Sequence, residues 1–123
     1  MYNILLIVHE QSEHIGTISS HIRAIESCHP HDVVKIDCKY AEHVKFSLFD
    51  VVILHYSLVI AYPSYISPRL AEKLQKFSGL TILFIQDEYR WIDRTAAAMR
   101  NLGVDVVFSL IDPAIVRKVY HHP

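Results

Sequence analysis

The sequence has no concentration of charge of one sign. Its formal net charge is −1 with histidine neutral, and its lysine and arginine residues are scattered along the chain. Nucleic-acid binding depends on a concentrated positive field that releases counterions from the phosphates. We therefore expect no nucleic-acid partner.

Long hydrophobic runs are also missing. The longest apolar stretch extends from Val51 to Tyr62 and is interrupted by His55, Tyr56 and Ser57. It is too short and too polar to span a bilayer. No basic segment precedes an apolar core at the N-terminus, as it does in a signal peptide. We expect a cytoplasmic protein without a transmembrane segment.

Cysteine is scarce, with 2 residues and no C-x-x-C pair, so Cys28 and Cys38 are expected to be reduced thiols. The 9 histidines raise the question of a metal site, for which Cys28, His29, His31 and Cys38 are the strongest group. Zinc sites use tighter pairs such as C-x2-C or H-x3-H, and this group straddles a predicted helix end and a strand. We predict no metal site.

Glycine-rich and nucleophile motifs are absent. The first polar loop has a single glycine, Gly16, where dinucleotide-binding folds have G-x-G-x-x-G. The chain has neither a Walker lysine nor a G-x-S-x-G elbow. These absences weigh against a dehydrogenase, an NTPase and a hydrolase, and we expect no cofactor in this domain.

The composition that is present belongs to a folded globular protein. Hydrophobic residues make up 51% of the 123 residues, and charged residues make up 20%. A chain of this length forms one domain and can bury roughly two-thirds of its unfolded surface. We therefore treat residues 1–123 as a single domain.

Hydrophobic patterns predict strands that alternate with helices. Short continuous apolar runs suit strands buried on both faces, and apolar residues at helical spacing lie between them. Ser67-Pro68 and Asp112-Pro113 are start signals, because Ser or Asp caps free N–H groups and Pro fits the first turn. Gly79 is expected to end the helix after Ser67 in a left-handed conformation. The expected strands are 3–8, 33–36, 51–54 or 51–55, 80–85 and 104–108. The expected helices are 17–29, 68–78, 92–102 and 113–120, and residues 38–49 are irregular or hold one short helix.

Sequential right-handed βαβ crossovers arrange these elements as an α/β three-layer sandwich. The prediction is a five-stranded parallel sheet with helices on both faces, Rossmann-like or flavodoxin-like. Ligands of this fold bind beyond the carboxyl ends of the strands, beside the switch in strand order.

Polar side chains follow several of the predicted strands and should gather at that edge. Carboxylate, imidazole and phenol groups suit charged or polyhydroxylated ligands, and a histidine paired with an acid could act as a general base. His55, after the third strand, is the candidate catalytic residue. The candidate binding residues are His9, Glu10, Tyr56, Gln86, Asp87, Glu88, Tyr89 and Arg90.

These candidates also have purely structural interpretations. His55 could be a strand-end histidine bonded to the backbone. Asp87 could cap the following helix. Arg90 could pair locally with Asp87 or Glu88, without a ligand.

Three segments resemble the amino-terminal, acceptor-side domain of GT-B-fold glycosyltransferases, of the group-1-like type encoded with surface-polysaccharide genes. They are Gly16–Ile18, Phe49–Ser57 and Phe84–Tyr89. The resemblance covers nearly the whole chain, although the first loop lacks the paired glycines that are usual in the family.

This resemblance implies that the chain is the N-terminal lobe of a longer protein and is inactive alone. A C-terminal domain would hold the sugar nucleotide, and the sugar would be transferred to a polysaccharide or glycan acceptor. By this resemblance, His55 and the loops at Glu10 and Asp87 would face the acceptor.

A degenerate receiver-like signalling or interaction module is the alternative, since length and strand alternation suit that fold. Receivers need a phosphorylatable Asp at the end of strand three, an acidic pair after strand one and a lysine after strand five. This chain has His55, His9-Glu10 and the Ser109–Ile111 region at those places. Phosphoryl chemistry through Mg²⁺ would lack its ligands.

Two further hypotheses are weaker. A flavodoxin-like binder would need a first loop rich in Ser, Thr and Gly for the flavin phosphate, and His9–Ile15 is bulky and acidic. A homodimer could form through the apolar residues of the last predicted helix, near Tyr120.

Overall fold

The computed structural model describes residues 1–85 and 92–109, and they fold around one parallel sheet. The five strands are arranged in the order β2-β1-β3-β4-β5. This flavodoxin-like order reverses direction beside β1, so the switch point lies between β1 and β3. The strands are β1 Asn3–Val8, β2 Asp32–Asp37, β3 Val51–Leu54, β4 Leu80–Ile85 and β5 Val106–Ser109.

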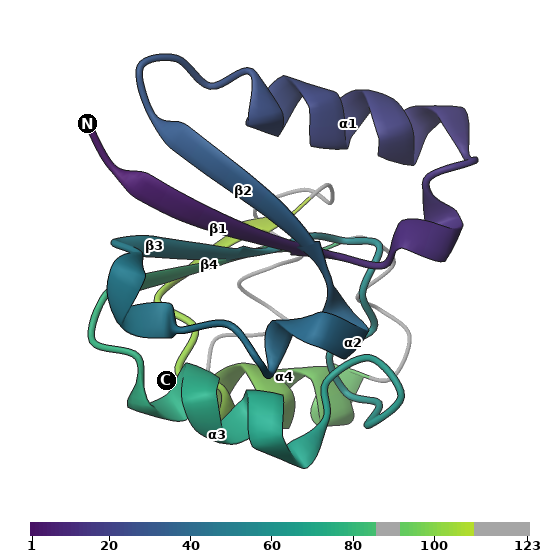
Figure 1. The fold of residues 1–123 in the computed structure, drawn as a ribbon. Coiled ribbons are helices and arrows are strands. Elements are labelled where there is room, and N and C mark those ends of the chain that lie inside the picture. The colour runs from purple at the N-terminus through teal and green to yellow at the C-terminus, as the bar shows by residue number, and fades with distance from the viewer. Residues whose placement is uncertain (86–91, 110–123) are drawn as a thin grey trace.

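Helices cover both faces of the sheet, as Figure 1 shows: α1 lies on one face, and α2, α3 and α4 lie on the other. The α-helices are α1 Gly16–Glu26, α2 Cys38–Ala41, α3 Pro68–Lys76 and α4 Ile92–Asn101, and the short 3-10 helices are η1 Glu10–Ser12 and η2 Phe46–Leu48. The predicted three-layer α/β sandwich is therefore confirmed.

The continuous apolar run of β1 is explained by burial on both sides. Successive side chains of a strand point to opposite faces. Leu5 and Ile7 accordingly join the core under α2, α3 and α4, while Leu6 and Val8 join the core under α1. All four are completely buried, and each contributes about 1.5–3 kcal/mol relative to an exposed side chain.

The start of α3 follows the sequence signal closely. The Ser67 hydroxyl accepts a hydrogen bond of 3.1 Å from the backbone N–H of Leu70, and Pro68 occupies the first turn. Gly79, however, is not a left-handed stop, and that prediction was wrong. A glycine is needed at position 79 because a Cβ there would collide with the carbonyl oxygen of Asp50 and the ring of Phe77. Within the described residues the glycine with a positive φ is Gly103, at 70°.

The remaining boundaries differ from the predictions by one to three residues, and the largest difference is at α1, which ends at Glu26 and not at residue 29. The strand predicted from residue 104 begins at 106, because the N–H of Val104 still bonds to the Met99 carbonyl at the end of α4. Residues 38–49, predicted to be irregular or to hold one short helix, contain the short helix α2 and the 3-10 helix η2, and Phe46 is buried there. The predicted last helix lies outside the described residues.

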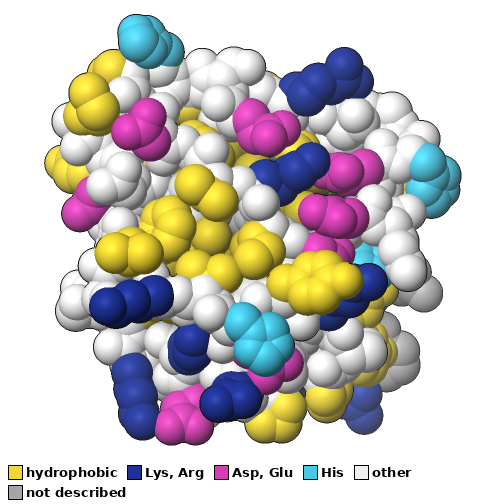
Figure 2. All heavy atoms as spheres, viewed as in Figure 1, with side chains coloured by type: hydrophobic (Ala, Val, Ile, Leu, Met, Phe, Trp, Pro, Cys, Tyr) yellow, Lys and Arg dark blue, Asp and Glu magenta, His cyan; other side chains and the backbone are white. Residues whose placement is uncertain are grey.

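The two edge strands are more exposed than the central ones. Val34 on β2 is 50% exposed, and Phe108 on β5 is 50% exposed. Figure 2 shows hydrophobic side chains gathered on the face where β2 forms the edge, with lysine, aspartate and glutamate side chains around them. No helix among residues 1–85 and 92–109 is long and apolar enough to cross a membrane.

Candidate functional site

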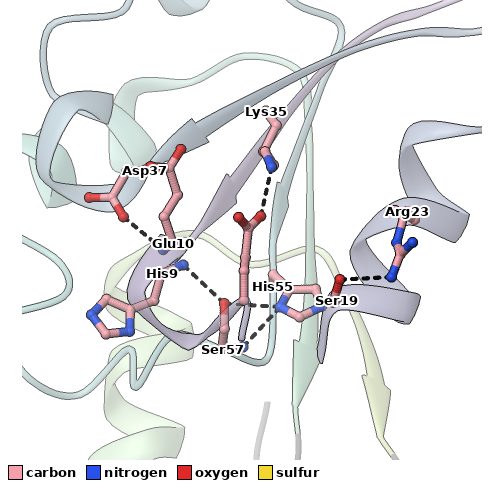
Figure 3. Close-up of polar contacts among 9 residues, drawn as sticks. His9, Glu10, Ser19, Arg23, Lys35, Asp37, His55 and Ser57 are labelled. Atoms are coloured by element: carbon pink, nitrogen blue, oxygen red, sulfur yellow. Dashed lines mark hydrogen bonds and ion pairs between the residues drawn. The ribbon is translucent and has the colours of Figure 1, made fainter. Parts of the chain in front are cut away.

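Residues that directly follow β1 and β3 meet a side chain of α1 at the carboxyl edge of the sheet, at the switch between β1 and β3. Ser57, just after β3, is buried and links the first two of these elements. Its hydroxyl accepts a hydrogen bond of 3.0 Å from the backbone N–H of His9 and lies 3.0 Å from Nδ1 of His55 (Figure 3). The loops after β1 and β3 are thus joined by one buried hydroxyl.

His55 follows β3 directly, and its side chain is 0% exposed. The backbone N–H of Ser57 donates to Nδ1 of His55 at 3.0 Å, and Nε2 of His55 lies 2.8 Å from Nδ1 of His21 on α1. Both ring nitrogens of His55 are therefore engaged within the protein. The interpretation of His55 as a strand-end histidine bonded to the backbone agrees with this geometry.

These contacts assign the tautomers of both rings. The backbone N–H of Ser57 can only donate, so Nδ1 of His55 must accept and carries no proton. A neutral His55 then carries its proton on Nε2 and donates it to Nδ1 of His21. A second proton on His21 would place two N–H groups against each other, so this hydrogen bond requires a neutral pair.

Burial keeps the pair neutral. Burial first, and the neighbouring His21 second, together lower the pKa of His55 to about 4. Burial also lowers the pKa of His21, which is partly exposed, below its ordinary value of 6.5. Moving an imidazolium out of water is unfavourable, and neither histidine is paired with an acid of residues 1–85 or 92–109.

Aromatic rings surround the histidine pair. Tyr56 stacks on His55 with a centroid distance of 4.3 Å and also lies 5.1 Å from His21. Its hydroxyl donates a hydrogen bond of 3.2 Å to the Thr17 carbonyl at the start of α1. Phe84 of β4 meets His21 edge to face at 4.9 Å. The contacts of Tyr56 hold α1 against the end of β3.

A second polar group joins the ends of β1 and β2. The Asp37 carboxylate, 5% exposed, accepts a hydrogen bond of 2.8 Å from the backbone N–H of Glu10 (Figure 3). It also accepts one of 3.0 Å from the backbone N–H of Lys39. Asp37 is thereby the N-cap of α2 and the anchor of η1. His9 is held separately, by a contact of 2.8 Å between its Nδ1 and the Ser12 hydroxyl.

The structure brings four of the candidate residues to this one edge: His9, Glu10, His55 and Tyr56. The candidates Gln86, Asp87, Glu88, Tyr89 and Arg90 lie outside the described residues. Their roles remain predictions.

Three residues of this edge were not among the candidates: Ser57, which directly follows Tyr56, and His21 and Asp37. His21 stands three residues after Ile18 and four before Ile25, so the helical period already placed it on the apolar face of α1. Asp37 is the last residue of β2. The other candidates were chosen because they follow the ends of strands, so the same criterion could have selected Asp37.

The described residues contain two sizeable cavities. One, of about 510 Å³, lies between α3, α4 and the loop before α3. The other, of about 470 Å³, lies beside the ends of β1 and β2 and includes His9, Asp37 and Tyr65 in its lining. No group of three or more His, Cys, Asp or Glu residues that could hold a metal ion occurs in the described part of the chain.

Comparison with known proteins gives a match of fold. No protein-family model matches the chain, and no curated protein matches it. Among solved structures, it is similar to a candidate response regulator from Chloroflexus aurantiacus J-10-fl, with a TM-score of 0.55 over 97% of this chain and 98% of that one. The sequence identity is 12%, so this likeness concerns the fold alone.

The resemblance to a glycosyltransferase was therefore wrong. The structural similarity is to a candidate response regulator, over nearly the full length of both chains. The segments that suggested the family, such as Phe49–Ser57, consist largely of a buried strand and its polar end. That pattern is common to many parallel α/β sheets. The glycan acceptor, the donor-binding domain and the sugar nucleotide rested on the resemblance alone.

Proposed function

We propose that the chain is a degenerate receiver-like module that acts by binding a protein partner and is not switched by phosphorylation at the end of β3. The observation that carries this proposal is the state of His55. The residue at the end of β3 is a fully buried imidazole whose two nitrogens are both hydrogen-bonded inside the protein.

Phosphoryl transfer needs a nucleophilic atom with a free lone pair that the donor can reach. Neutral His55 has one lone pair on its ring nitrogens, at Nδ1, and that atom accepts the N–H of Ser57. The Ser57 hydroxyl, 3.0 Å away, occupies the same side of the ring. His55 is a poor substitute for an exposed aspartate, which offers two carboxylate oxygens.

The loop after β1 is similarly unsuited to hold Mg²⁺. This cation prefers several oxygen ligands in octahedral geometry, and receivers supply an acidic pair at this place. Here His9 precedes Glu10, and the ring of His9 is bonded to Ser12 through Nδ1. The loop has two carboxylates, and that of Glu13 is paired with Lys35 at 2.7 Å. Glu10 therefore supplies the one exposed carboxylate of this loop.

The contacts around His55 favour one fixed state of the edge. His21 and Tyr56 both connect α1 to the end of β3, through a contact of 2.8 Å and a hydrogen bond of 3.2 Å. In a switchable receiver this region must rearrange when a charge is added. A domain fixed in one state suits constitutive binding of a partner. The likeness in fold over 97% of the chain supports treating residues 1–123 as one such module.

Beryllofluoride with Mg²⁺ tests the proposal, because it forms a complex on a receiver aspartate that mimics the phosphorylated state. We expect the amide spectrum of the ¹⁵N-labelled protein to stay unchanged when both are added at millimolar concentration. The His55→Asp variant serves as a comparison for a carboxylate at the same position. Shifts in the wild-type protein centred on the loops after β1 and β3 would overturn the proposal.

A further inference from the structure

The cavity beside the ends of β1 and β2 is distinct from the buried histidine pair. Its volume of about 470 Å³ falls within the range of small-molecule sites, about 300–1,000 Å³. It also lies next to the switch in strand order, where ligands of doubly wound sheets bind. Its lining consists of His9, Glu10, Gln11, Asp37, Cys38, Lys39, Ser64 and Tyr65.

Asp37 gives this cavity a fixed framework. One of its oxygens holds the backbone of Glu10 and the other holds the backbone of Lys39. The side chains of Glu10 and Lys39, both of which line the cavity, therefore start from two backbone positions fixed by the same carboxylate. Preorganisation of this kind lowers the entropy cost of binding a small ligand.

The two side chains bring opposite charges to the cavity, and both are exposed. Among the described residues, the Glu10 carboxylate makes no hydrogen bond or ion pair, and its interaction with the charge of Lys35 is weaker than that of Glu13. The Lys39 ammonium lies 5.1 Å from the ring centroid of Tyr40 and forms no salt bridge within the described chain. Each charge is thus available to an ion of opposite sign.

An aromatic wall completes the cavity. The rings of His9 and Tyr65 meet edge to face, with a centroid distance of 4.9 Å and an interplanar angle of 63°. Ring pairs of this kind offer apolar surface to a flat side chain. The contact between Nδ1 of His9 and the Ser12 hydroxyl fixes one of the two rings.

We propose that this cavity binds a small zwitterion with a flat apolar side chain, the chemistry of an aromatic α-amino acid. The ligand's ammonium group would pair with Glu10, its carboxylate with Lys39, and its side chain would pack on His9 and Tyr65. A phosphate ester fits less well, because Glu10 and Asp37 would repel it and Lys39 alone would oppose them. A neutral sugar would leave both exposed charges without a counter-ion.

Isothermal titration calorimetry with three related probes tests this assignment. L-phenylalanine carries both charged groups, phenethylamine lacks the carboxylate, and 3-phenylpropanoate lacks the ammonium. We expect 1:1 binding of phenylalanine, with an affinity at least about fivefold higher than that of either truncated probe, because each probe loses one charge-assisted contact.

Two substitutions assign the contacts. Lys39→Met should weaken phenylalanine and 3-phenylpropanoate about fivefold to tenfold and leave phenethylamine unchanged. Glu10→Gln should weaken phenylalanine and phenethylamine and leave 3-phenylpropanoate unchanged. Both variants keep the backbone N–H groups that bond to Asp37 and should fold normally. The exposed residues Glu26 and Lys45 lie outside the cavity lining, so Glu26→Gln and Lys45→Met are the matched controls.

Three results would overturn the proposal. They are no binding of phenylalanine at 10 mM, equal affinity for the three probes, and affinities that neither substitution changes. This test is independent of the proposed function. The beryllofluoride experiment concerns the end of β3, and either proposal can fail while the other holds.

Discussion

Nδ1 of His21 and Nε2 of His55 are 2.8 Å apart, and a backbone N–H decides which of the two rings donates. Because Ser57 donates to the other nitrogen of His55, the proton between the rings belongs to Nε2 of His55. The contact between α1 and the end of β3 consequently depends on two neutral histidines.

This relationship predicts the tautomers directly. At pH 7.5, histidine-selective ¹⁵N NMR should show the Nε2–H tautomer for both His21 and His55. Assignment can use the His21→Gln variant, in which one set of signals disappears. An Nδ1–H tautomer or an imidazolium at His55 would contradict the hydrogen-bond assignment.

The same pair predicts a loss of stability in acid. The pKa of His55 is lowered to about 4 in the folded state, against 6.5 when unfolded, so the unfolded chain binds more protons within this window. Its contribution to the free energy of unfolding is complete above pH 6.5 and is lost as the pH falls toward 4. The shift corresponds to a loss of about 3 kcal/mol.

Urea unfolding at pH 7.5 and pH 4 measures this loss. In the His55→Leu variant the difference in unfolding free energy between the two pH values should be smaller than in the wild-type protein by about 3 kcal/mol. His43 is exposed, and His43→Gln should keep the wild-type difference. An equal pH dependence in His55→Leu and wild type would refute the assignment to His55.

Asp37 should be the most sensitive carboxylate of the described edge. Asp37→Ala removes the acceptor for two backbone N–H groups, at Glu10 and Lys39. Since hydrogen bonds to charged groups contribute about 1.5–3 kcal/mol each, we expect a destabilisation of roughly 2–5 kcal/mol. Chemical denaturation at pH 7.5 measures this effect. The exposed Asp32→Ala should cost less than about 0.5 kcal/mol, and a similar cost at Asp37 would contradict the role assigned to it.

The two glycines Gly79 and Gly16 should respond oppositely to alanine. At Gly79 a Cβ would collide with the Asp50 carbonyl, so Gly79→Ala should destabilise the domain by about 1–3 kcal/mol. At Gly16, the first residue of α1, a Cβ meets nothing within 4 Å. Gly16→Ala should be neutral or stabilise by up to about 1 kcal/mol. Thermal unfolding of both variants compares them, and equal effects would contradict the close approach at Gly79.

Much of the fold could be predicted because its signals are local. Ser67-Pro68 marks the start of α3 within two residues, and the continuous apolar run of β1 already indicates burial on both faces. The role of Gly79 was predicted wrongly because its constraint is a contact with Asp50, which precedes β3 and is distant in sequence. A local sequence pattern does not reveal a contact between residues that are far apart in the sequence.

The candidate site was harder to predict for the same reason. His9, Glu10, His55 and Tyr56 could be placed at one edge, because parallel strands all end there. The hydrogen bond between His21 and His55 joins positions 34 residues apart, and the two bonds of Asp37 join β2 to both η1 and α2. The predicted glycosyltransferase family was wrong because the three segments that suggested it are features of parallel α/β folds in general and not of one family.

The most direct test of the account is the intact mass of the wild-type protein after incubation with acetyl phosphate and Mg²⁺. We predict an unchanged mass, because the imidazole at the end of β3 is buried and its one lone pair already accepts a hydrogen bond. An added phosphoryl group that maps to His55, or to a carboxylate in the loops after β1 or β3, would contradict the proposal that this module acts without phosphorylation.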